Sequence, residues 1–76
     1  MTSLTSAANK CGFHRVVLQE DEGWVYAFAF ERPAPSIPAR DYLLETWTLA
    51  KQFCLEEWGV PLDGWEPTNE APNSAS

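Results

Sequence analysis

The sequence has little of what catalysis usually requires. It contains one histidine, and its four glycines are not clustered into a phosphate-binding loop. No acid or nucleophile is spaced from His14 in a way that marks a catalytic set or a metal site. We therefore predict no enzymatic activity, no metal and no cofactor, and we expect His14 to be a surface residue of a strand.

Cysteine is also scarce. The two cysteines, Cys11 and Cys54, have no Cys-x-x-Cys spacing. A disulfide between them is possible, but nothing in the pattern indicates one, and free thiols in a reducing compartment are the preferred interpretation. No stretch approaches the roughly 18 apolar residues of a membrane span, and residues 1–10 lack the apolar run of a signal peptide. We expect a soluble cytoplasmic protein that does not bind membranes.

Basic residues are few. Five Lys and Arg oppose eleven Asp and Glu, so the formal net charge is -6. A nucleic-acid backbone would be repelled by this charge, which argues against nucleic-acid binding. An acidic surface favours solubility and basic partners.

Aromatic residues, in contrast, are plentiful. Four Trp, two Tyr and four Phe all lie between Phe13 and Trp65. Residues 1–10 and 67–76 are rich in small polar residues and are predicted to be flexible, because they bury too little apolar area to offset their ordering entropy. A single domain is therefore expected over residues 11–66.

A β-hairpin is predicted in the first half of this domain. Residues 13–19 and 24–31 have strand character, and the acidic residues 20–22 with Gly23 form the turn. The second strand alternates between an aromatic face and a face of small residues. The aromatic face is expected to receive a helix. The aromatic face consists of Trp24, Tyr26, Phe28 and Phe30. The face of small residues consists of Val25, Ala27 and Ala29.

A long helix is predicted over residues 38–58. Three prolines in residues 32–38 end the hairpin, and Pro38 suits a first helical turn. Gly59 is placed as the residue that ends the helix, with Val60 making the accompanying apolar contact. The predicted fold is a small α+β domain of ββα type, in which the antiparallel hairpin packs on one long C-terminal helix and both termini are flexible.

This helix carries two apolar stripes, and one hairpin covers only one of them. The stripe expected to pack on the hairpin consists of Leu43, Trp47, Ala50, Cys54 and Trp58, with Leu44 and Leu55 on its flank. The stripe of Tyr42, Leu49 and Phe53 is therefore the candidate partner-binding surface. Glu56 and Glu57 are added as acidic contacts at the helix end. An open edge of the hairpin is the rival interface. In a monomer, the segment containing Leu62 and Trp65 would cover the second stripe instead.

The segment His14–Ala27 resembles the opening hairpin of HicB-type antitoxins, which also join an apolar strand, an acidic turn with glycine and an aromatic strand, followed by a helix. The family's Pro-Asp-Leu-Pro-Gly segment and its third strand have no counterpart in the sequence, where the proline-rich residues 32–38 follow. The resemblance implies an antitoxin-like protein.

Three functions remain open. The first is a small protein-interaction module, such as an adaptor, assembly factor or regulatory subunit, that self-associates as a homodimer. The second is an antitoxin or inhibitor that presents an acidic surface to a basic partner. The third is a non-catalytic subunit of an enzyme.

Overall fold

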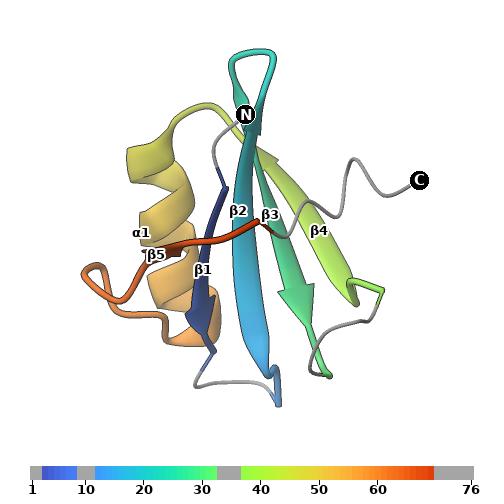
Figure 1. Ribbon diagram of the computed structural model, residues 1–76. Helices are drawn as coiled ribbons and strands as arrows, with labels where there is room; N and C mark the ends of the chain where they lie inside the picture. The colour runs from blue at the N-terminus through green and yellow to red at the C-terminus, as the bar shows by residue number, and fades with distance from the viewer. Residues whose placement is uncertain (1–2, 9–11, 33–36, 70–76) are drawn as a thin grey trace.

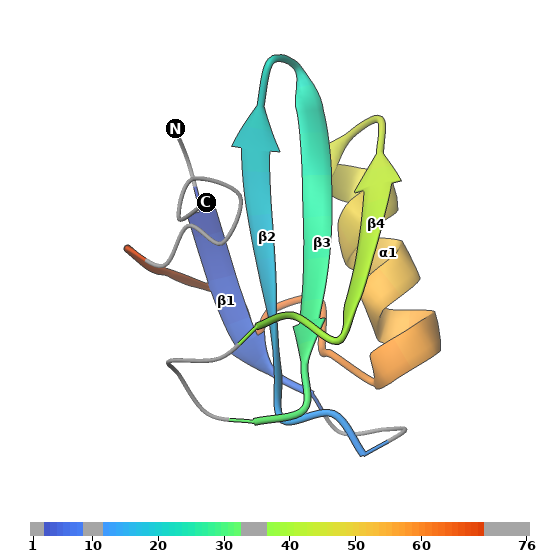
Figure 2. The same ribbon diagram turned by 90° about the vertical axis from the view of Figure 1, so that its right-hand side faces the viewer.

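The computed structural model describes residues 3–8, 12–32 and 37–69. It contains a five-stranded antiparallel sheet and one helix, which confirms the predicted α+β class. The strands lie in the order β4-β3-β2-β1-β5, and α1 covers one face of the sheet (Figures 1 and 2). Within the described ranges, no helix is long and apolar enough to cross a membrane. In chain order the elements are β1 (Ser3–Ala7), β2 (Arg15–Asp21), β3 (Trp24–Phe30), β4 (Arg40–Leu44), α1 (Trp47–Trp58) and β5 (Glu66–Pro67).

The predicted hairpin is formed by β2 and β3, with Val17 opposite Phe28 in the register. Its turn has positive φ at both central residues, +53° at Glu22 and +84° at Gly23. Two successive positive φ values define the primed turn whose twist matches that of antiparallel strands. Gly23 adopts this conformation readily, whereas Glu22 carries a side chain that disfavours it.

The helix packs on the opposite face of the hairpin from the one predicted. It covers Val25, Ala27 and Ala29, so the prediction that the aromatic face receives the helix is wrong. Ala27, Ala29, Ala50 and Cys54 are all 0% exposed at this junction. The physical reason is size, because small side chains on both elements let the helix approach the sheet closely and exclude water.

The helix is also shorter than predicted. Residues 38–46 do not belong to it: Arg40–Leu44 form β4, which pairs with β3, and α1 begins only at Trp47. Thr46 caps the helix, because its Oγ1 accepts a hydrogen bond from the backbone N–H of Leu49 at 3.1 Å. The prediction of one long C-terminal helix is therefore wrong.

The end of the helix agrees with the prediction. Gly59 has left-handed φ and ψ values of 67° and 28°, and its N–H donates to the carbonyl of Leu55 at 3.1 Å. The N–H of Val60 donates to the carbonyl of Cys54 at 3.3 Å, and the Val60 side chain is fully buried in the core. Both contacts belong to the helix-terminating motif that the sequence indicated.

Two strands near the chain ends were not predicted. Ser3–Ala7, expected to be flexible, form β1 between β2 and β5, while Glu66–Pro67 form β5. A polar segment such as β1 becomes ordered because its backbone is hydrogen-bonded on both sides, which compensates for its weak apolar pattern. The predictions of a free thiol at Cys11 and of flexibility in residues 70–76 lie outside the described residues, as do residues 33–36 of the proline-rich link.

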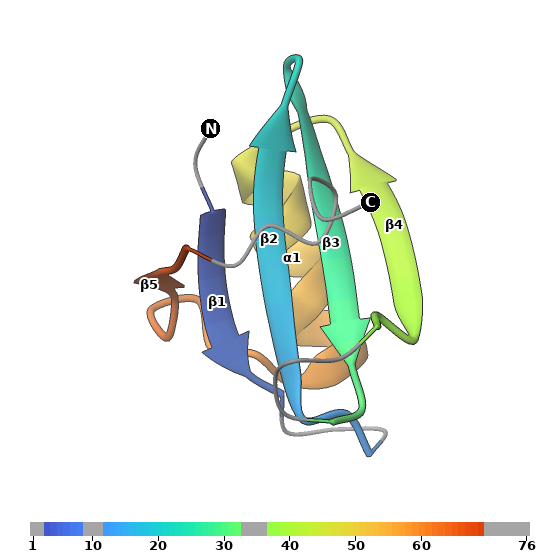
Figure 3. The same cartoon turned by 45° about the vertical axis from the view of Figure 1, so that its right-hand side comes forward.

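The hairpin has no free edge, because β1 lies beside β2 and β4 lies beside β3. A partner at the hairpin edge, the rival interface in the sequence analysis, is therefore excluded for β2 and β3. The outermost strands of the sheet are β4 and β5, which Figure 3 shows at its two sides.

The core has two parts. The larger lies between the sheet and α1, and its fully or nearly fully buried members are Val16, Leu18, Val25, Ala27, Ala29, Ala50, Cys54, Trp58 and Val60. The smaller lies on the other face and contains Val17, Phe28 and Phe30. There the rings of Tyr26 and Phe28 stack at 6.0 Å, and the guanidinium of Arg15 lies 3.8 Å from the centroid of the Phe30 ring.

Candidate partner-binding surface at the β4 edge

β4 is an outermost strand with β3 as its one neighbour in the described sheet. It has five residues and no proline. An outermost strand presents backbone N–H and C=O groups along its outer side, which another strand can pair with. Natural edges usually carry a device against such pairing, and the charged pair Arg40 and Asp41 at the start of β4 is a modest one.

Exposed large apolar side chains gather around this strand. We call the set of Trp24, Tyr42, Leu43 and Leu49 the β4 surface; their exposed fractions are 44%, 42%, 49% and 51%. Tyr42 lies on the α1 face of the sheet, because it is opposite the core residue Ala27, while Leu43 lies on the other face opposite Tyr26. Apolar surface therefore flanks the strand on both faces, which is a pattern typical of protein interfaces.

An aromatic cluster supports the α1 side of this surface. The ring of Tyr42 lies 4.8 Å from that of Phe53 and 5.7 Å from that of Trp58, and the rings of Phe53 and Trp58 are 5.4 Å apart. Phe13 contacts Trp58 edge-on at 5.8 Å. Trp58 is 3% exposed and belongs to the core. Tyr42 is thus held in a fixed orientation at the edge, which lowers the entropy cost of binding through it.

The five predicted contact residues do not share one helix face. Tyr42 belongs to β4, whereas Leu49 and Phe53 belong to α1, and the fold brings Tyr42 and Phe53 together through the ring contact. Glu56 and Glu57 lie in the last turn of α1, where Glu56 accepts a hydrogen bond from the side-chain amide of Gln52 at 3.1 Å.

The predicted second stripe is therefore partly internal. Phe53 is only partly exposed and packs against Tyr42 and Trp58, so Leu49 is the member of the stripe that α1 leaves most open. The alternative covering segment does not take this place through Leu62, which is 52% exposed. Trp65 packs against the main core instead.

Sequence reasoning missed two members of the β4 surface. Leu43 was assigned to the buried stripe of a helix, and Trp24 to the face under that helix. The available signal was Thr46, whose side chain and position before Trp47 are typical of a helix N-cap. Starting the helix there would have released residues 40–44 to form a strand.

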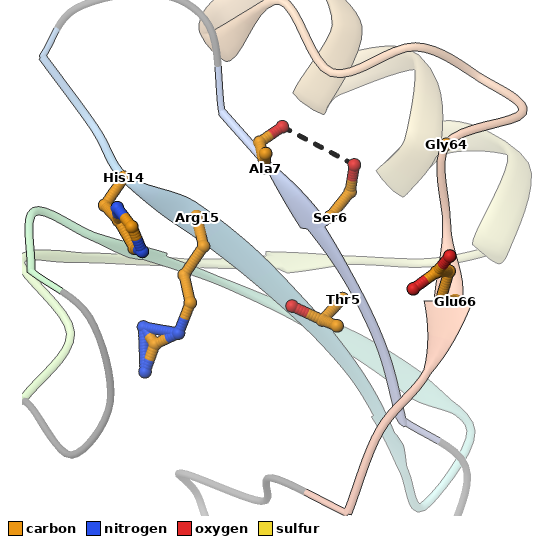
Figure 4. Close-up of a pocket in the computed structure, with 7 residues that line it drawn as sticks. All are labelled: Thr5, Ser6, Ala7, His14, Arg15, Gly64 and Glu66. Atoms are coloured by element: carbon orange, nitrogen blue, oxygen red, sulfur yellow. Dashed lines mark hydrogen bonds between the residues drawn. The ribbon is translucent and has the colours of Figure 1, made fainter.

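A pocket of about 400 Å³ with polar and apolar walls lies at the other side of the sheet, near β1 and β5 (Figure 4). His14 and Arg15 line it from one side of β1 and Glu66 from the other, so the imidazole and the carboxylate are separated by a strand. Its polar groups are engaged locally: Thr5 Oγ1 donates to the carbonyl of Val16 at 3.1 Å and Arg15 Nη1 donates to that of Arg32 at 3.3 Å. The pocket offers polar contacts but no paired acid and base.

Other reactive groups are few in the described ranges. They contain no group of three or more His, Cys, Asp or Glu side chains that could hold a metal ion. Cys54 is a free thiol with 0% exposure, and its burial raises its pKa to about 12. A thiol that stays protonated is a poor nucleophile, so Cys54 acts as a small apolar core residue.

The hairpin turn and the end of β4 form an acidic corner. Gly23, Trp24 and Glu45 line a second surface pocket of about 480 Å³ there. Glu22 precedes Gly23 in the turn and is exposed. A carboxylate beside an exposed indole ring is an arrangement that suits a Lys or Arg side chain.

No protein-family model, curated protein or solved structure matches this chain.

Proposed function

We propose that this protein is a small protein-interaction module that self-associates through the β4 surface and performs no chemistry of its own. The observation that carries this proposal is an edge strand with apolar side chains exposed on both of its faces. Leu43 and Tyr42 lie on opposite faces of β4 and are 49% and 42% exposed. Burying such side chains against a second chain favours association by roughly 25 cal/mol for each Å² removed from water.

The chain offers a matched set of leucines for testing this proposal. Leu43 and Leu49 belong to the β4 surface and Leu62 lies in the return to β5, with exposed fractions of 49%, 51% and 52%. Replacing each by Lys adds the same charge at nearly the same exposure. Leu43→Lys and Leu49→Lys should raise the dissociation constant at least tenfold, whereas Leu62→Lys should leave it unchanged.

The measurement is the solution mass by light scattering over a wide range of protein concentration. A wild-type protein that remains monomeric up to about millimolar concentration, where association is worth only about 4 kcal/mol, would remove the proposal. An equal loss of association in Leu62→Lys would instead move the interface away from β4.

A second candidate function follows from the acidic corner. An antitoxin-like or inhibitory protein would present Glu22, Trp24 and Glu45 to a basic side chain of its partner. Salt separates the two candidates. Added salt should tighten association between two copies that each carry a net charge of -6, and should weaken the binding of a basic partner.

A further inference from the structure

We propose that two copies of this protein pair their β4 strands antiparallel, with Tyr42 of one copy opposite Tyr42 of the other, so that their sheets merge into one. The inference rests on the proposed self-association, and it specifies the geometry of the contact. It follows from the symmetry of strand pairing, from the order of charges along β4 and from the place of α1 above the sheet.

Symmetry restricts how the two strands can meet. In an antiparallel pair, residues directly opposite each other project to the same face. A twofold axis that relates two antiparallel edge strands is perpendicular to the sheet, so it leaves both helices on the same face. A residue of the α1 face, such as Tyr42, must therefore be opposite another residue of that face. Residues of one face occupy every second position along a strand, so the twofold axis must pass through the position of a residue and not between two residues.

The charges along β4 exclude three of the five registers that are centred on one of its residues. Centring the axis on Arg40 or Asp41 places that residue opposite its own copy, and centring it on Leu43 places Asp41 opposite Glu45. Like charges directly opposite each other are destabilising. No two like charges face each other when the axis lies at Tyr42 or at Leu44. Tyr42 is the middle residue of the five in β4, so of these two registers only the one centred on Tyr42 pairs every residue of the strand.

The position of α1 fits this arrangement. The helix packs against both β3 and β4 (Figure 2). Strands in a sheet are about 4.8 Å apart, so two helices above the merged sheet would lie roughly 10–15 Å apart. Packed helices approach to about 8–10 Å, and side chains on the facing sides bridge a slightly larger gap. Leu49 of each copy and the Tyr42 pair then lose their contact with water.

The proposed contact also limits the number of copies that can associate. β4 of each copy is used once, and the other outermost strand, β5, has two residues and contains Pro67, which has no N–H to donate. β5 covers Leu4 and Thr5 of β1, so each end of the merged sheet is a short, partly covered edge with few groups for further pairing. We therefore expect the association to stop at the dimer and not to continue into a fibre.

Cysteine trapping in the full-length protein tests the register. In a Cys11→Ser background, Tyr42→Cys should form a disulfide-linked dimer under mild oxidation, because directly opposite residues have Cα atoms about 4.5–5.5 Å apart. Arg40→Cys alone should not cross-link, since the two copies of position 40 would lie roughly 13 Å apart. The native Cys54 does not interfere, as it is fully buried.

A second pair of variants leaves Tyr42 in place. Mixed in equal amounts, Arg40→Cys and Leu44→Cys should cross-link to each other, because position 40 is opposite position 44 in this register. A dimer by light scattering with neither cross-link overturns the register and leaves the proposed function standing. A monomer by light scattering overturns both. Efficient cross-linking at Tyr42 and in the mixture, with none for Arg40→Cys alone, supports the inference.

Discussion

The two edges of the sheet differ in almost every property that governs strand pairing. β4 has five residues and exposes Tyr42 and Leu43, while β5 has two residues and contains a proline. β4 is supported from one face by α1 and by the ring cluster around Trp58. β5 is held by a pairing with β1 at Leu4 and Thr5. The β5 edge therefore offers few groups for further pairing, whereas the β4 edge presents an ordered apolar surface.

The largest expected effect on stability comes from removing the buried ring that packs beneath the β4 edge. Trp58→Ala removes a nearly fully buried ring that contacts Tyr42, Phe53 and Phe13, and should lower the free energy of unfolding by about 3–5 kcal/mol. The matched variant Trp65→Ala, near β5, should cost clearly less because Trp65 is only partly buried. Urea denaturation of both variants is the measurement, and equal losses would contradict the asymmetry between the two edges.

The pH dependence of the free energy of unfolding at high pH reports on how well α1 excludes water from Cys54. Cys54 keeps its proton in the folded state up to a pKa of about 12, against 9.0 for an unburied thiol. Above pH 9 the unfolded chain loses that proton and the folded chain keeps it, so this group makes the free energy of unfolding fall by up to about 1.4 kcal/mol per pH unit. The stability difference between wild type and Cys54→Ala should shrink from pH 9 to pH 11. A constant difference would mean that the thiol ionises within the fold.

Loss of the helix cap should loosen one edge more than the other. Thr46→Ala removes the acceptor for the Leu49 N–H and should cost about 1 kcal/mol, whereas Thr46→Ser should retain most of the stability. The cap lies just after β4, so amide hydrogen exchange should accelerate in β4 and the first turn of α1 but not in β1. Uniform acceleration throughout the sheet would show that the edges do not open independently.

The smallest expected effect is at the turn that joins the two central strands, β2 and β3. Glu22 has a φ of +53°, a conformation that Asn tolerates better than Glu. Glu22→Asn should therefore stabilise the protein by about 0.5–1 kcal/mol. The turn belongs to neither edge, so the solution mass should not change. Thermal unfolding with light scattering checks both statements, and a changed mass would connect the turn to the interface.

The parts of the fold that were predicted correctly carry strong local signals. The period-two pattern from Trp24 to Phe30, the turn that ends at Gly23 and the end of α1 at Gly59 depend on neighbours close in the chain. The turn itself is shorter than predicted, because Glu20 and Asp21 belong to β2. β4 was mistaken for helix because Leu43 and Leu44 fit one helical stripe and Tyr42 fits the other, as well as all three fit a short strand. β1 was missed because a polar strand is stabilised by its neighbours β2 and β5, which no local pattern reveals.

The candidate site was predicted in part, for a related reason. Tyr42, Leu49 and Phe53 were singled out as excess apolar surface on one helix, and the structure brings Tyr42 and Phe53 into contact from different elements. Leu43 was assigned to a helix because the predicted helix began too early, whereas α1 begins at Trp47. Trp24 was assigned to the covered face of the hairpin, whereas α1 packs on the alanine face, where small side chains allow a close approach.

The sequence by itself determined the acidity, the α+β class, the hairpin and the end of the helix, because these depend on composition and on residues a few positions apart. Only the tertiary structure decided which face of the hairpin is covered, that residues 40–44 form an edge strand, and which edge of the sheet stays open. Those features depend on pairing and packing between segments distant in the chain, where backbone hydrogen bonds and side-chain size outweigh local preference.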